Sequence, residues 1–115
     1  MLIGGHMSET IAVWGKLTLG TTDLDGIIVT HKEGDLGSGV IVGPDGLLIM
    51  NNGEISGNAN RGECSGVIIS GGDFKMYGGT IVKNTITESG FGGGVYITSG
   101  SFEMYGGTIA DNTAV

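Results

Sequence analysis

The sequence is poor in the residues that define many protein classes. Its 115 residues include one cysteine and one proline, and charged residues make up 15%. A lone cysteine excludes an intramolecular disulfide framework, and a lone proline with irregularly spaced glycines excludes a collagen triple helix. No apolar run reaches the length of a transmembrane helix or a signal-peptide core. Because 39% of the residues are hydrophobic, a flexible linker is also excluded, and a folded, turn-rich domain remains.

Basic residues are also few. Five lysines and arginines face twelve acidic residues, which gives a net charge of -7. This balance argues against nucleic acid and anionic membranes as partners, since both carry dense negative charge. We therefore expect neither nucleic-acid binding nor membrane insertion.

Glycine is abundant, with 25 residues, and it recurs inside a repeat. The string MYGGTI occurs at residues 76–81 and again at 104–109. Around it, residues 66–85 align with 94–113 without a gap. Weaker copies occupy residues 39–58 and 11–24. Such a period is the signature of a solenoid or a related repeat architecture.

Each repeat contains three short segments in which apolar and polar residues alternate, separated by glycine or serine. Alternation with a period of two indicates strands, and no segment shows a helical period. We therefore predict an all-β protein, a parallel β-helix of about four coils with three short strands per coil and no significant helix. The coils are expected at residues 10–38, 39–65, 66–93 and 94–115. Residues 1–7 contain a Gly-His-Met run typical of a tag or vector remnant, so a single domain is expected over residues 8–115.

Stacking of the coils predicts columns of equivalent side chains. The inward columns are Leu17, Leu48, Phe74 and Phe102; Leu19, Met50, Met76 and Met104; and Leu24, Ile55, Ile81 and Ile109. A column of Asn58, Asn84 and Asn112 follows the third strand, and we expect it to form a ladder in which the amides hydrogen-bond between coils.

The repeat unit G-G-V-Y-I-x-x-G-x-F-x-M-x-G-G-T-I-x-x-N-T-A resembles the repeats of right-handed parallel β-helix proteins of the pectin-lyase-like superfamily. More narrowly, it is similar to the glycine-rich repeats of bacterial adhesin-like surface proteins, including the polymorphic outer-membrane group. The GGAI and FxxN elements of that group read GGGV at residues 92–95 and IVKN and IADN at 81–84 and 109–112. Isoleucine replaces the phenylalanine. The resemblance covers residues 39–115, and it implies a right-handed solenoid and an extracellular or cell-surface location.

The same superfamily contains polysaccharide lyases and hydrolases, whose active sites, as the resemblance implies, cluster aspartates with a basic partner. Here the closest acidic pair is Asp23 and Asp25, which a solvated turn explains better. The only arginine, Arg61, lies in a loop between coils. Paired carboxylates are what glycoside hydrolysis needs, so we predict no catalytic residues.

The candidate metal ligands and the single cysteine are also explained better without a functional site. His31, Glu33 and Asp35 alternate as metal ligands on a strand would, but a solvated loop joining the first two coils explains them better. Cys64 has no nearby histidine in sequence, and either a half-buried loop thiol or an intermolecular disulfide is expected. We predict no metal and no cofactor.

The outward side chains are more informative. Tyr77 should lie over Tyr105, and Lys75 over Glu103 as an ion pair between coils. The candidate interaction strip consists of this tyrosine pair, Tyr77 and Tyr105, and of an apolar outward row made of Ile41, Ile68 and Tyr96. An aromatic stripe of this kind could bind a sugar ring or a protein, or it could be ordinary stacking between coils.

A β-helix must cover its ends, and the repeat pattern stops within a loop at residues 113–115 with no capping helix. We therefore expect a fragment of a longer array, or self-association through uncapped ends, with Trp14 covering the first coil. The predicted function is a non-catalytic structural and interaction module of an adhesin-like bacterial surface or secreted protein that binds a glycan or a protein. The alternatives are a truncated or non-catalytic part of a polysaccharide lyase or hydrolase, and a pure spacer.

Overall fold

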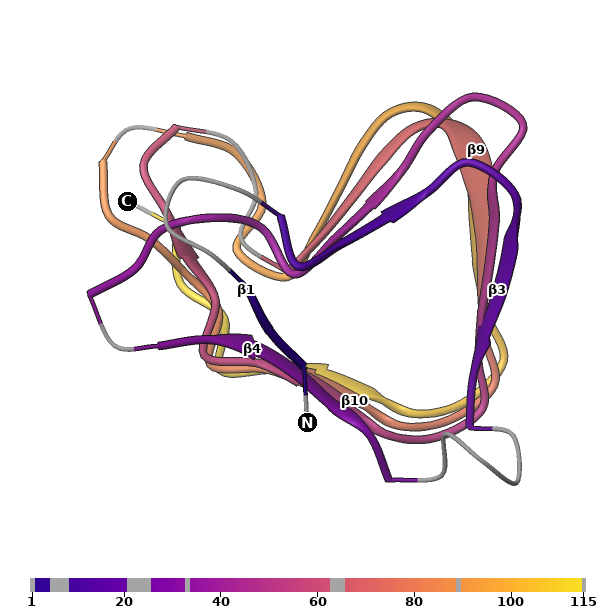
Figure 1. Ribbon diagram of the computed structural model, residues 1–115, viewed down its shortest axis with the longest axis horizontal. Coiled ribbons are helices and arrows are strands. Elements are labelled where there is room, and N and C mark those ends of the chain that lie inside the picture. Colours follow the sequence, from indigo (N-terminus) through magenta and orange to yellow (C-terminus); the bar gives the residue numbers. More distant parts are fainter. Residues whose placement is uncertain are drawn as a thin grey trace.

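The computed structural model describes residues 2–4, 9–20, 26–32, 34–62, 66–88 and 90–114. Every regular element in these ranges is a β-strand, and all strand pairs are parallel. The chain winds through about three complete turns and part of a fourth, so that its coils superimpose in the view of Figure 1. The predicted parallel β-helix is thus confirmed. In the described residues there is no helix that could cross a membrane.

The strands follow the predicted coils. The first coil contains β2 (Ile11–Val13), β3 (Lys16–Leu19) and β4 (Ile28–His31). The second contains β5 (Val40–Val42), β6 (Leu47–Met50), β7 (Glu54–Ser56) and β8 (Ala59–Asn60). The third contains β9 (Val67–Met76), β10 (Thr80–Val82) and β11 (Thr85–Ile86), and the fourth β12 (Val95–Met104) and β13 (Thr108–Ala110). One further strand, β1 (Leu2–Gly4), precedes them.

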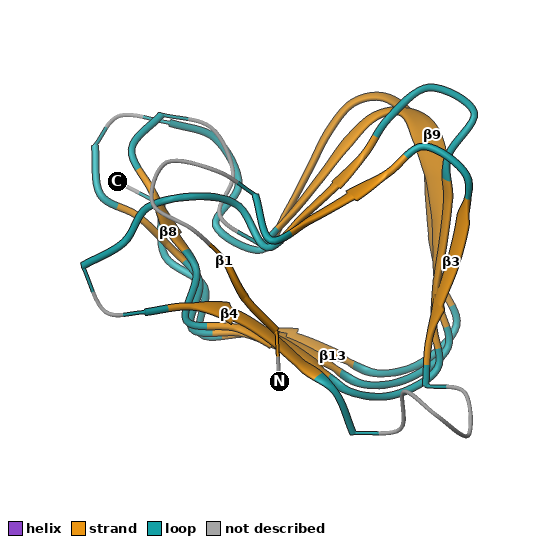
Figure 2. Cartoon of the chain, in the orientation of Figure 1, coloured by secondary structure: helices purple, strands orange, loops and turns teal. Residues whose placement is uncertain are grey.

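Three sheets run along the solenoid (Figure 2). The six-strand sheet contains β2, β3, β5, β6, β9 and β12, the five-strand sheet has the order β1-β4-β7-β10-β13, and β8 pairs with β11. The long strand β9 pairs with both β5 and β6. The first two predicted segments merge into one strand in the third and fourth coils, with register shifts between Ile97 and Ser101 in β12.

The predicted inward columns form the core. Phe74 pairs in register with Leu48 and Phe102, and Met76 with Met50 and Met104. Stacked identical side chains exclude water because neighbouring parallel strands lie only about 4.8 Å apart. The rings of Phe74 and Phe102 accordingly stack with centroids 4.9 Å apart.

The first member of the third column was predicted wrongly. The register places Val29, and not Leu24, beside Ile55, and Leu24 lies outside the described residues. The first repeat is longer than the others between its second and third strands, so counting from the later repeats led to the wrong residue.

Glycines permit the corners at which the chain turns. Gly79, between β9 and β10, has a φ of +87°, a conformation that a residue with a Cβ rarely adopts. At the start of β9 the requirement is spatial, since a Cβ on Gly66 would lie 2.1 Å from the carbonyl oxygen of Gly94. The high glycine content therefore reflects turns and close backbone contacts.

The N-terminal end differs from expectation in two ways. Trp14 does not cover the first coil: its side chain is 64% exposed and packs against Gly43 on the outside. Instead, β1 pairs with β4 and adds a fifth strand to the five-strand sheet. Part of the segment interpreted as a vector remnant therefore takes part in the fold.

Candidate interaction surfaces

The three predicted asparagines come together as a ladder, in which Asn58 and Asn84 are buried and Asn112 is half-buried. The side-chain Nδ2 of Asn58 donates to Oδ1 of Asn84 at 2.9 Å, and Nδ2 of Asn84 donates to Oδ1 of Asn112 at 2.9 Å. Each Nδ2 also donates to a backbone carbonyl of the preceding coil, at 3.3, 3.1 and 2.9 Å. Each of these hydrogen bonds thus joins two coils, and the ladder has a structural role.

His31 forms the N-terminal end of this ladder. It ends β4, is buried, and places its Nδ1 2.8 Å from Oδ1 of Asn58. Both amide hydrogens of Asn58 are already donated, so Oδ1 accepts and Nδ1 of His31 carries the proton. The expectation of a solvated loop at His31 was wrong, because its ring continues the asparagine column into the first coil.

Tyr77 and Tyr105 form an exposed stack. They directly follow β9 and β12 at equivalent positions, and their rings lie 5.0 Å apart with planes 12° from parallel. Their side chains are 49% and 61% exposed. The ring spacing matches the distance between coils, so the backbone register holds both rings in place.

Glu103 is hydrogen-bonded to Tyr105 instead of forming an ion pair. Glu103 and Lys75 are register partners, but the hydroxyl of Tyr105 donates to Oε2 of Glu103, and no ion pair joins Lys75 to Glu103. The pKa of Tyr105 is raised, chiefly because the neutral phenol donates to this carboxylate. The hydrogen bond therefore orients the Tyr105 ring.

The remaining three residues of the predicted strip belong to a separate row. Ile41, Ile68 and Tyr96 are register partners in the first half of the six-strand sheet. Ile68 is only 5% exposed, and Tyr96 stacks on Phe91 with centroids 5.1 Å apart. This row is therefore less accessible than the tyrosine stack, since Ile68 is buried and Phe91 lies against Tyr96.

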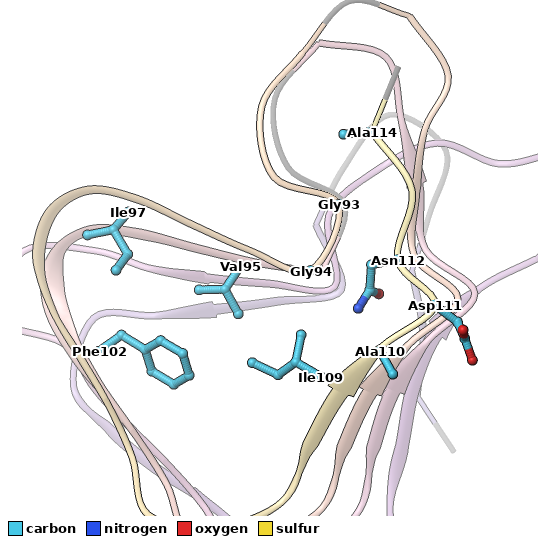
Figure 3. Close-up of a pocket in the computed structure, with 10 residues that line it drawn as sticks. All are labelled: Gly93, Gly94, Val95, Ile97, Phe102, Ile109, Ala110, Asp111, Asn112 and Ala114. Carbon is cyan, nitrogen blue, oxygen red and sulfur yellow. The ribbon is translucent and has the colours of Figure 1, made fainter.

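A third surface is the open C-terminal end of the core (Figure 3). A cavity of about 550 Å³ opens among the inward residues of the last coil. Figure 3 shows the side chains of Val95, Phe102 and Ile109 pointing into this space, with Asn112 at its edge. Ile97 and Met104 are 44% and 45% exposed. The same column positions are fully buried one coil earlier, so this end is an uncovered coil interface.

The other candidate residues form no site. Asp23, Asp25, Glu33 and Cys64 lie outside the described residues. Arg61 contacts Glu88 at 3.8 Å, and both side chains are exposed. In the described ranges, no three histidine, cysteine, aspartate or glutamate side chains are grouped so that they could hold a metal ion.

Comparisons with known proteins assign the chain to no family. No protein-family model, curated protein or solved structure matches this chain.

Proposed function

We propose that this chain is a non-catalytic structural and interaction module of a bacterial cell-surface or secreted protein, and that it presents a flat face of its solenoid to a glycan. The observation that carries the proposal is the exposed, parallel stack of Tyr77 on Tyr105. An adhesin-like role is what the resemblance of the repeats implies.

The stack leaves one aromatic face for a ligand. One face of Tyr105 lies against Tyr77, and the opposite face points away from the third coil. A sugar ring offers apolar C–H groups that pack on such a face, while its hydroxyls need polar partners at the rim. Glu103 and Lys75 supply an acceptor and a donor in the neighbouring outward row. The surface combines the two kinds of contact that a pyranose needs.

Charge narrows the ligand class to uncharged glycans. The chain carries a net charge of -7, which disfavours acidic polysaccharides at a distance. Near the tyrosines one carboxylate and one ammonium group balance each other, so neither sign is favoured locally.

The test is binding of neutral oligosaccharides to the wild type and to Tyr105→Ala, first on an array and then by titration calorimetry. Loss of one stacking face should weaken binding about tenfold, or ~1.4 kcal/mol. Tyr96→Ala is the matched control, because it removes an aromatic ring from the same strand but from the partly covered row. Unchanged affinity in Tyr105→Ala would contradict the assignment of the strip.

Two further outcomes separate the alternatives. Release of reducing or unsaturated ends from polysaccharides by the wild type would favour a carbohydrate-active enzyme. Binding to a surface protein, with no binding to any neutral glycan, would replace the glycan by a protein partner. Absence of both would favour a spacer.

A further inference from the structure

The tyrosine stack stops inside the chain, at the second coil. Asn51 directly follows β6, as Tyr77 follows β9 and Tyr105 follows β12. The backbone nitrogen of Tyr77 donates to the carbonyl of Met50 at 2.8 Å. That of Tyr105 donates to the carbonyl of Met76 at 2.7 Å. Asn51 therefore has the same position relative to Tyr77 that Tyr77 has relative to Tyr105, and the outward row changes there from two rings to an amide.

This change leaves part of the Tyr77 ring uncovered. One face of the ring lies against Tyr105, with ring centroids 5.0 Å apart, so the other face points toward the second coil. The side chain of Asn51 is shorter than a tyrosine side chain and reaches only the part of that face nearest the backbone. Tyr77 accordingly remains 49% exposed although it has neighbours on both sides. The outer part of its ring forms a wall beside the second coil.

The surface next to this wall carries an amide that the fold does not use. The ladder asparagines bond to one another, Asn52 accepts from the backbone nitrogen of Gly26 at 3.0 Å, and Asn60 donates to Ser38 at 3.3 Å. Asn51 is exposed, and within the part of the chain that the structure describes its side chain makes no hydrogen bond. Its Oδ1 and Nδ2 are thus an acceptor and a donor offered to a ligand.

The rest of this surface is apolar or bare. Ile49 lies two residues before Asn51 and is half-buried on the outward side of β6, between buried residues. In the first coil the equivalent of Asn51 is Gly20, which follows β3 and adds no side chain. The surface beside Tyr77 therefore extends over two coil spacings, or about 10 Å. We call Tyr77, Asn51 and Ile49 the tyrosine step.

We infer that the tyrosine step is a second sugar contact, in which one pyranose packs its C–H groups on Tyr77 while Asn51 binds two adjacent hydroxyls. The inference rests on the proposed glycan function and names a further part of the ligand. An amide accepts from one hydroxyl through Oδ1 and donates to the next through Nδ2, so it recognises a vicinal pair. A few placed polar groups beside an apolar surface orient a ligand in this way. The ligand is therefore a neutral pyranose with two adjacent free hydroxyls.

The step is separate from the contact proposed at Tyr105. The two lie on opposite sides of the stacked rings, since the step uses the face of Tyr77 that points toward the second coil. The step is formed by the second and third coils, each of which has a neighbouring coil on both sides. A substitution at Asn51 thus removes one contact and leaves the other in place.

The test is titration calorimetry with neutral tetrasaccharides of glucose, mannose, galactose and xylose. Asn51→Ala removes both hydrogen bonds to the diol and should weaken binding about tenfold. Asn51→Tyr extends the stack by one ring, fills the step and should weaken binding at least as much. Thr108→Ala is the matched control, because Thr108 is an exposed polar residue of the five-strand sheet, and its affinity should equal that of the wild type. Melting curves of Asn51→Ala and the wild type should coincide, since the fold does not use this amide.

A second measurement tests the hydroxyl pair directly. Analogues of the bound sugar that each lack one hydroxyl should identify a pair whose loss weakens binding to the wild type. Against Asn51→Ala, the same analogues should cause no further loss, because the partner of these hydroxyls is already absent. If Asn51 only supported the shape of the surface, the analogues would weaken binding to the variant and the wild type equally, and the inference would be overturned.

The outcomes separate this inference from the proposed function. Unchanged affinity in both Asn51 variants, together with weaker binding in Tyr105→Ala, would overturn the step and leave the glycan proposal intact. Weaker binding in Asn51→Ala with unchanged affinity in Tyr105→Ala would support the step and contradict the contact at Tyr105. A wild type that binds none of the tetrasaccharides would overturn both. If Asn51→Tyr loses its β-sheet circular dichroism, Asn51→Leu replaces it.

Discussion

The third and fourth coils have almost the same sequence but different surroundings. Phe74 and Met76 in the third coil are fully buried, whereas the equivalent Phe102 is half-buried and Met104 is 45% exposed. The strands β9 and β12 keep one register over most of their length. The difference therefore comes from the neighbours, since the third coil is covered on both sides and the fourth on one. In a solenoid, a side chain is stabilised by the coils next to it more than by its own repeat.

The largest effect should appear in the phenylalanine column. Phe74→Ala opens a cavity in a fully covered coil and should cost about 3–5 kcal/mol of unfolding free energy. Phe102→Ala removes a ring that still contacts water, so about 1–2 kcal/mol is expected. Urea unfolding followed by circular dichroism measures both. Equal losses would show that the fourth coil is covered in solution.

In the asparagine ladder, too, a substitution in the third coil should cost more unfolding free energy than one in the fourth. Both losses should be smaller than those in the phenylalanine column. Asn84→Ala removes the acceptor of one amide hydrogen of Asn58 and the side-chain donor to the carbonyl of Ile55, both in a buried region, which should cost about 2–3 kcal/mol. Asn112→Ala breaks bonds at the open end, where water can replace them, and about 1 kcal/mol is expected. The exposed Asn51→Ala is the control, with a change within about 0.5 kcal/mol. A larger loss in Asn112→Ala than in Asn84→Ala would contradict this ranking.

The residue before each ladder asparagine offers a stabilising change. Gly57, Lys83 and Asp111 all have a positive φ, between 55° and 66°. Lys83→Gly relieves about 1–2 kcal/mol of left-handed strain and loses about 0.5–1 kcal/mol through the more flexible unfolded chain. The free energy of unfolding should therefore rise by about 0.5 kcal/mol, which thermal unfolding measures. Lys83→Ala keeps the strain and should bring no gain, so a gain there would assign the effect to the lost charge.

The repeat made most of the fold predictable. The inward columns from Leu48 to Phe102 follow from alternation plus one gapless alignment, because parallel stacking forces equivalent residues into contact. Val29 escaped prediction because the first repeat departs from the common length. β1 escaped because Leu2–Gly4 belongs to no repeat, and its place is shown by its pairing with β4.

The candidate surfaces were less predictable than the core. Tyr77 over Tyr105 follows from the register, but the stacking of Phe91 on Tyr96 involves a residue of the connection between coils, which the repeat does not encode. His31 shows the same limit. Its ring replaces an asparagine amide in the ladder, a substitution between different residue types that alignment of the repeats does not reveal.

The smallest effect concerns Tyr105 and its partner in the fourth coil. The hydrogen bond to Glu103 is the largest cause that raises the pKa of Tyr105, followed by partial loss of water and by the charges of Glu103 and Tyr77. Because the folded pKa lies above the unfolded one, the stabilisation is complete below the unfolded value near 10 and is lost as the pH rises through the folded value. Ultraviolet titration of Glu103→Gln should show one phenol ionising at lower pH than in the wild type, while Asp73→Asn in the third coil should leave the curve unchanged. Coincident curves for Glu103→Gln and the wild type would mean that the hydrogen bond does not persist in water, and the ring that the glycan proposal needs would then lack its fixed orientation.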